Sequence, residues 1–78
     1  MPAEDHRRQA HLEVAQLHRE WDALHVTLRT REQELSAAIA LYARGEGPRP
    51  DLLVSKIEQI RAECARRFQE MIAATRSL

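Results

Sequence analysis

The chain has 78 residues, with 12 basic and 12 acidic side chains and a single cysteine, Cys64. This length predicts one domain, 1–78, and one cysteine excludes an intramolecular disulfide. The balanced charge argues against a nucleic-acid partner, because phosphate contacts need a basic excess. No window approaches the roughly 18 apolar residues of a membrane span, and no signal-peptide stretch opens the sequence. The missing signal peptide and the lone thiol lead us to expect a cytoplasmic protein. Arginine stands at all basic positions except Lys56, which leads us to expect a bacterial source.

The first predicted element is a helix over about residues 3–44. This stretch lacks glycine and proline and is rich in alanine, leucine, glutamate and arginine, which favour helices. Apolar residues recur in an a/d heptad pattern over about four heptads. The stripe consists of Val14, Leu17, Trp21, Leu24, Leu28, Leu35, Ala38 and Tyr42. Arg31 interrupts it at one core position.

A turn is predicted over residues 45–50, which hold both glycines and two of the three prolines. Gly45 suits the left-handed position just past a helix end. A second helix over about 51–76 then begins either with Pro50 at its first position or with Asp51 as its cap.

The second helix carries its own apolar stripe, with a spacing that drifts from a strict heptad. The stripe consists of Leu53, Ile57, Ile60, Cys64, Phe68 and Met71. Cys64 is therefore interpreted as a core residue and not as a reactive thiol. Charged pairs four residues apart, Glu63 with Arg67 and Arg66 with Glu70, are expected on the exposed surface.

The two stripes predict an all-α fold, an antiparallel two-helix hairpin that resembles a coiled coil. With the turn at its centre, the expected register sets these pairs opposite one another: Leu28 and Phe68, Trp21 and Ala74, Arg31 and Glu63. Arg31 either forms an ion pair with Glu63 or extends its guanidinium out of the seam. Residues before about Leu17 are expected to have nothing opposite them, since the first helix is the longer one.

More apolar surface is present than two helices can cover. The apolar residues outside the seam are Leu12, Val26, Ile39, Leu41, Leu52, Val54 and Ile72. Two hairpins packed as a four-helix bundle would cover them, so a homodimer is expected. The candidate core and interaction residues are Leu12, Val14, Leu17, Trp21, Leu24, Leu28, Ile39, Phe68 and Ile72.

Three histidines recur every seven residues beside the seam: His11, His18 and His25. Histidine binds metals and titrates near neutral pH. A seven-residue step spans about 10.5 Å of helix, however, so one ion cannot bridge two of them within one chain. Solvated histidines are the favoured interpretation and no metal is expected. A metal or pH sensor remains the alternative, with ligands from two copies.

No catalytic or cofactor motif is present in the sequence, such as a nucleophile elbow or a glycine-rich phosphate loop. The aromatic residues Trp21, Tyr42 and Phe68 all fall on the stripes, where core packing is the simplest role, and Trp21 could also anchor a partner helix. The prediction is a non-enzymatic protein–protein interaction module that self-associates, with no cofactor and no membrane or nucleic-acid partner. An adaptor that binds another helical protein is the alternative.

The stretch from Tyr42 to Cys64 contains the turn Arg-Gly-Glu-Gly-Pro-Arg-Pro-Asp, followed by Ile-Glu-Gln-Ile-Arg-Ala-Glu-Cys. In these residues the chain resembles small proteobacterial helical-hairpin proteins of unknown function. The resemblance implies the hairpin and carries no functional residues. In architecture alone the chain is also similar to secretion co-chaperones, which are helical hairpins that bind an aggregation-prone partner.

Overall fold

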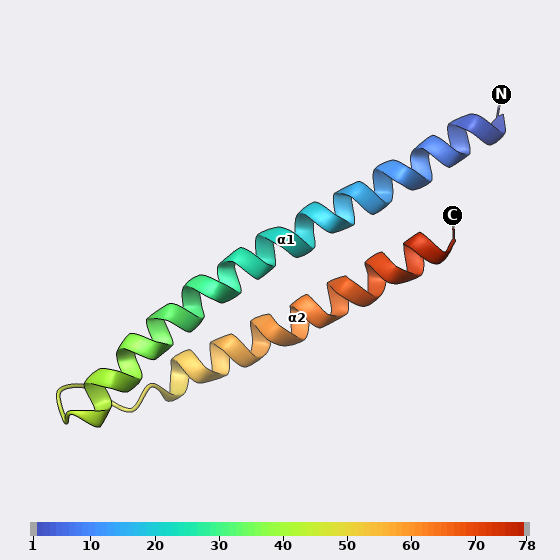
Figure 1. The fold of residues 1–78 in the computed structure, drawn as a ribbon. Coiled ribbons are helices and arrows are strands. Elements are labelled where there is room, and N and C mark those ends of the chain that lie inside the picture. Colours follow the sequence, from blue (N-terminus) through green and yellow to red (C-terminus); the bar gives the residue numbers. More distant parts are fainter. Residues whose placement is uncertain (1, 78) are drawn as a thin grey trace.

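The structure, a computed structural model, describes residues 2–77 as two helices joined by one turn. Helix α1 runs Pro2–Ala43 and helix α2 runs Asp51–Arg76. The helices lie side by side and antiparallel (Figure 1), within a rod of 66 × 14 × 13 Å. No strand occurs among the described residues. The predicted all-helical, two-helix architecture is confirmed, with helix ends within a residue of those expected.

The C-terminal end of α1 is closed by a left-handed glycine. Gly45 has φ +73°, a conformation that side chains with a Cβ rarely adopt. Its N–H donates to the carbonyl of Tyr42 at 3.0 Å, and the N–H of Glu46 donates to the carbonyl of Leu41 at 2.9 Å. These two bonds form a Schellman motif, which satisfies carbonyls that the helix leaves without partners. The left-handed position predicted for Gly45 is confirmed.

Helix α2 begins at Asp51, one residue after the start expected with Pro50 as first residue and one before the start expected with Asp51 as cap. Pro50 occupies the cap position and Asp51 is the first helical residue, so both predicted roles are wrong by one position. The Pro50 side chain offers no cap hydrogen bond, although its carbonyl accepts the N–H of Val54 at 3.0 Å. Asp51 instead places its negative charge in the first turn, where it favours the positive end of the helix dipole.

The core is small and lies at the middle of the hairpin. Its buried hydrophobic side chains are Leu28, Ile57 and Cys64, with 7 %, 2 % and 7 % of their surface exposed. Partly buried apolar side chains pack around them: Leu24, Leu35, Leu53 and Ile60. All of these residues belong to the predicted stripes. Two helices therefore enclose one narrow row of side chains and no more.

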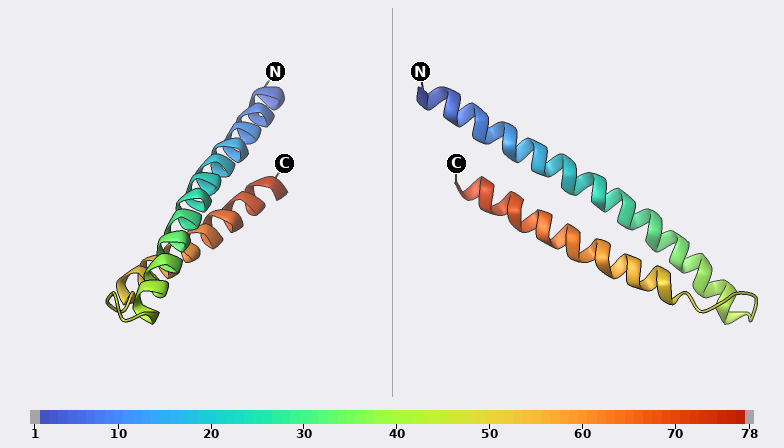
Figure 2. Two further views of the ribbon diagram at one scale, coloured as in Figure 1. Left: turned by 60° about the vertical axis from the view of Figure 1, so that its left-hand side comes forward. Right: turned by 180° about the vertical axis from the view of Figure 1, so that it is seen from behind.

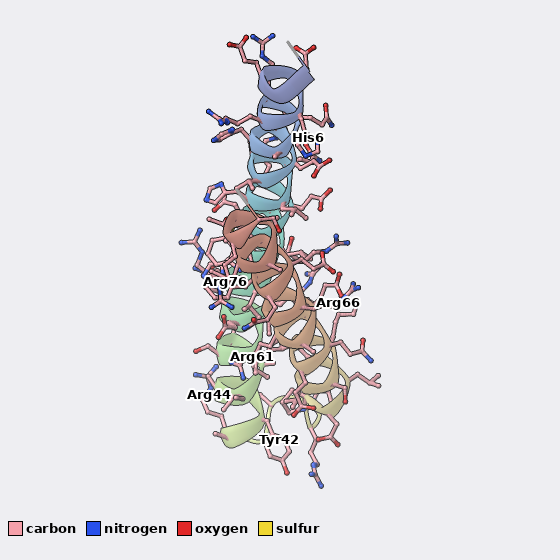
Figure 3. All side chains as sticks on the ribbon, turned by 90° about the vertical axis from the view of Figure 1, so that its right-hand side faces the viewer. His6, Tyr42, Arg44, Arg61, Arg66 and Arg76 are labelled. Carbon is pink, nitrogen blue, oxygen red and sulfur yellow. The ribbon has the colours of Figure 1, made fainter. Side chains whose placement is uncertain are left out.

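Two aromatic residues expected in the seam are exposed instead. Tyr42 is 48 % exposed because it lies at the closed end of the hairpin, where the chain turns away (Figure 3). Phe68 is 40 % exposed. The stripe reaches Phe68 through two successive steps of four residues, from Ile60 to Cys64 and from Cys64 to Phe68. Each such step rotates the stripe around the helix relative to a straight seam. Phe68 therefore lies at the edge of the seam.

The register across the hairpin also differs from the expected one. The ring of Phe68 lies 6.1 Å from the ring of Trp21, so the aromatic partner of Trp21 is Phe68 and not the predicted neighbour Ala74. The Arg31–Glu63 ion pair is likewise not formed. Arg31 binds Glu34 of its own helix at 2.8 Å, because a neighbour three positions along is reached without crossing the seam.

At the open end of the hairpin, residues near the start of α1 have the end of α2 opposite them. Four residues of α1, one of α2 and the residue just past α2 line one small hollow there: His6, Gln9, Ala10, Glu13, Ala74 and Ser77. The expectation that residues before about Leu17 have nothing opposite them is therefore wrong. Only the first residues of α1 extend past the end of α2 (Figure 2).

Candidate interaction surface

Large apolar side chains remain exposed along both helices. Of those predicted outside the seam, Leu12, Val26, Ile39, Leu41 and Leu52 are 57 %, 48 %, 50 %, 41 % and 89 % exposed. Val54 and Ile72 are half-buried, which corrects the prediction for these two residues. The total accessible surface is 6136 Å². A compact monomer of 9.0 kDa exposes about 4,850 Å², so this hairpin exposes about 1,300 Å² more.

The candidate residues on the seam are distributed around the small core. Leu28 is buried, while Val14, Leu17, Trp21 and Leu24 are half-buried. Their half-burial follows from the architecture, since a seam between only two helices has solvent on both sides. The same solvent reaches Ile39 and Phe68, which border it.

One long side of the hairpin, the aromatic side, carries rings and apolar groups from both helices. We define it by His18, Trp21, His25, Glu32 and Ile39 of α1 and by Arg61, Phe68 and Ile72 of α2. Trp21 stacks on His25 with ring centres 5.1 Å apart, and it lies 6.1 Å from both His18 and Phe68. Such ring contacts stabilise beyond simple burial, by about 0.5–1.5 kcal/mol. Trp21 is thus held between the helices with part of its surface free.

Among the described residues, one ion pair crosses the seam on the aromatic side. The Arg61 guanidinium lies 3.0 Å from the Glu32 carboxylate. Arg61 lies toward α1 in Figure 3, whereas Arg66 extends from the outer side of α2. The side chains of Arg61 and Glu32 are 58 % and 41 % exposed, so water screens their attraction. Beside them lies a shallow apolar hollow that includes Leu35 and Ile39.

The opposite side, the charged side, carries a connected network. We define it by Glu20, Glu63, Arg66, Arg67 and Glu70. Arg67 contacts Glu20 of α1 at 3.2 Å and Glu63 and Glu70 of its own helix at 3.1 and 3.6 Å. The predicted helical pairs Glu63–Arg67 and Arg66–Glu70 are both confirmed. Every member of this network therefore has a partner of opposite charge.

Contacts with two arginines lower the pKa of the Glu63 carboxyl. Hydrogen bonds from the Arg66 guanidinium, together with the charge of Arg66 and contacts from Arg67, hold the pKa of the Glu63 carboxyl below its usual value. The same contact raises the pKa of Arg66. The Glu63 carboxylate and the Arg66 guanidinium thus stabilise each other's charged forms.

A second apolar hollow, of about 410 Å³, lies at the closed end. It is lined by Ala38, Leu41, Gly47, Pro48, Arg49, Pro50, Leu52 and Leu53. Gly47 borders it closely, because a Cβ there would lie 3.2 Å from the Cβ of Leu41. The hollow is mostly apolar and open to solvent.

The histidine stripe is not assembled into a metal-binding group. His11 donates through Nδ1 to the carbonyl of Arg7 at 2.8 Å, while His18 and His25 flank Trp21. Within residues 2–77, no three histidine, cysteine or acidic side chains lie close enough to hold a metal ion. Burial raises the pKa of the Cys64 thiol, which keeps it protonated and unreactive.

Sequence reasoning missed two features of this surface. One is the stacking of Trp21 on His25, for which the four-residue spacing on one helix was an available signal. The other is the contact of Arg67 with Glu20, for which the sequence offers no signal, because it depends on the register between the helices.

Neither helix, over the part of the chain described, is long and apolar enough to cross a membrane. Comparison with known proteins adds no relative: no protein-family model, no curated protein and no solved structure matches the chain.

Proposed function

We propose that the protein is a non-enzymatic helical interaction module that functions as a homodimer, in which two hairpins pair as a four-helix bundle. The observation that supports this most is the excess of exposed surface, about 1,300 Å² over a compact monomer of the same mass. A standard protein interface takes about 800 Å² from each partner. The excess therefore exceeds the area that each partner contributes to an interface of standard size.

The small core supports the same proposal. Only three of the described side chains are buried hydrophobic residues, so the hairpin by itself removes little apolar surface from water. Small scaffolds of this kind gain stability from disulfides, metals or oligomerisation. The only cysteine is buried and unpaired, so association is the available route.

The proposal predicts that folding and association are coupled. For a dimer, the unfolding midpoint Tm rises with protein concentration by mass action. Circular dichroism melts from 1 to 100 μM are therefore expected to show a rising Tm. A Tm that is constant over this range, with full helicity at the lowest concentration, would show that the lone hairpin is stable and would contradict the proposal.

A second candidate function is supported by the apolar hollow at the closed end. Leu52, 89 % exposed, and Leu41 present apolar groups beside Pro48 and Pro50, away from the aromatic side. Such a patch suits an apolar side chain from a different helical protein, as in an adaptor or co-chaperone. This function predicts a chain that alone has poorly dispersed NMR signals and gains order on coexpression with its partner, an effect that Leu52→Asp abolishes.

A further inference from the structure

We propose that the second copy docks on the aromatic side in the antiparallel direction, with the two-fold axis beside His25. The inference rests on the self-association proposed above and adds the face and the direction of the dimer. It follows from three observations: the difference between the two sides, the order of polar groups along α1, and the position of the aromatic contacts.

The two sides differ in what a partner would have to desolvate. On the charged side, Arg67 is already shared among Glu20, Glu63 and Glu70, and burying such a network costs solvation without offering new partners. The aromatic side offers exposed Phe68 and Ile39, with half-buried Trp21 between polar groups. Interfaces favour aromatic groups at their centre and polar groups at the rim. The aromatic side therefore fits the second copy.

The direction follows from the residues that recur every seven positions on this side of α1. His18 precedes His25 by seven residues and Glu32 follows it by seven, about 10.5 Å on either side. A two-fold axis perpendicular to the helix at His25 places His18 of each copy opposite the partner's Glu32. An imidazole N–H can donate to that carboxylate while Arg61 keeps its own contact with it. A two-fold axis running along the helices, as in a parallel dimer, would instead bring α1 opposite the partner's α2, and this pair would not form.

A second pair on the neighbouring edge of α1 has the same symmetry. Asp22 and Arg29 are both exposed and lie three residues before and four residues after His25. Among residues 2–77, neither one forms an ion pair within its own chain. The axis at His25 sets Asp22 of one copy near Arg29 of the other, twice in the dimer. In a parallel dimer this edge of α1 lies opposite the partner's α2, and the pair would not form.

The aromatic contacts then fall at the centre of the interface. Trp21 and His25 lie within about one helical turn of the axis, so the stacked pair of one copy approaches that of the other. Phe68 packs on the same tryptophan from α2. The result is an aromatic centre bordered by the His18–Glu32 and Asp22–Arg29 pairs, which is the arrangement of a specific interface.

The direction is tested with a spin label at the closed end, which lies outside both sides. Glu46→Cys is introduced into a Cys64→Ala chain and labelled, and the label–label distance is measured by pulsed electron resonance. An antiparallel dimer about His25 separates the two labels by about 60 Å, since about 21 residues lie on each side of the axis. A distance below about 30 Å overturns the antiparallel direction while leaving the dimer intact. Absence of any dipolar coupling together with monomer mass overturns both the inference and the self-association.

The face is tested with a charge exchange that leaves the core untouched. Asp22→Arg is expected to weaken dimerisation about fivefold, and the double change Asp22→Arg with Arg29→Asp is expected to restore it, because both symmetric pairs re-form with reversed charge. Glu13→Arg, an equal charge change at an exposed position bordering the opposite edge of the seam, serves as the matched control and should leave dimerisation unchanged. Weaker dimerisation of the Glu13→Arg chain would overturn the assignment of this face. Failure of the double change to restore dimerisation would also overturn it.

Discussion

Arg67 of α2 reaches across the seam to within 3.2 Å of the Glu20 carboxylate of α1. This contact ties the helices together on the charged side, as Arg61 with Glu32 does on the aromatic side. The two pairs differ in exposure: the side chains of Arg67 and Glu20 are 32 % and 38 % exposed, whereas Arg61 is 58 % exposed. Water therefore screens the second pair more strongly.

This difference predicts unequal coupling energies. A double-mutant cycle with Arg67→Met and Glu20→Gln is expected to give about 0.5–1 kcal/mol, and the matched cycle at Arg61 and Glu32 about 0–0.5 kcal/mol. Urea unfolding measures both. Equal couplings, or a larger one for Arg61–Glu32, would show that exposure does not determine the contribution of these pairs.

Gly45 is expected to be the most sensitive position of the turn. Gly45→Ala forces a Cβ into a backbone conformation with φ +73° and should reduce the free energy of unfolding by about 1 kcal/mol. Gly45→Asn should cost less, because asparagine tolerates the left-handed region. Urea unfolding of the three chains provides the measurement. Equal stability of the alanine variant and the native chain would contradict the Schellman geometry.

The lowered pKa of Glu63 predicts that the protein loses stability in acid. The pKa of this carboxyl is lower in the folded chain than in the unfolded chain, where it is near 4.5, so its contribution is fully present above the unfolded pKa. The contribution is lost as the pH falls through the lower folded pKa. Thermal unfolding from pH 7 to pH 2 is expected to show this decrease, and Glu63→Gln should show a shallower one. Identical pH profiles for the two chains would rule out this role of the arginine contacts.

Ile57 is the most buried side chain of the core, with 2 % of its surface exposed. Ile57→Ala removes buried methylene groups and leaves a cavity, so it is expected to lower the free energy of unfolding by about 2–4 kcal/mol. Lys56→Ala, one residue away on the exposed surface, should change it by about 0.5 kcal/mol or less. Comparable losses in the two variants would mean that the helices do not pack along the observed seam.

Much of the fold follows from local sequence signals. Gly45 and Pro50 mark the turn, and the heptad spacing around Leu28 and the stripe through Ile57 identify the buried rows. These predictions succeed because helix ends depend on residues close to them and because a helix buries one face.

The register was less predictable, and the errors have a common cause. The sequence spacing did not show that Arg67, next to Phe68, would approach the seam while Phe68 moved to its edge. That depends on how far the two successive four-residue steps rotate α2, and on how the turn offsets one helix against the other. The contact between Trp21 and Phe68 results from both and could be recognised only in three dimensions.

The central claim is that this hairpin covers its exposed apolar surface with a second copy of itself. Sedimentation equilibrium of the native chain at 10–50 μM and neutral pH measures this directly. A homodimer gives a mass twice the 9.0 kDa of one chain, and this is the expected result. A single species of 9.0 kDa at every concentration, with the helices fully formed, would contradict it.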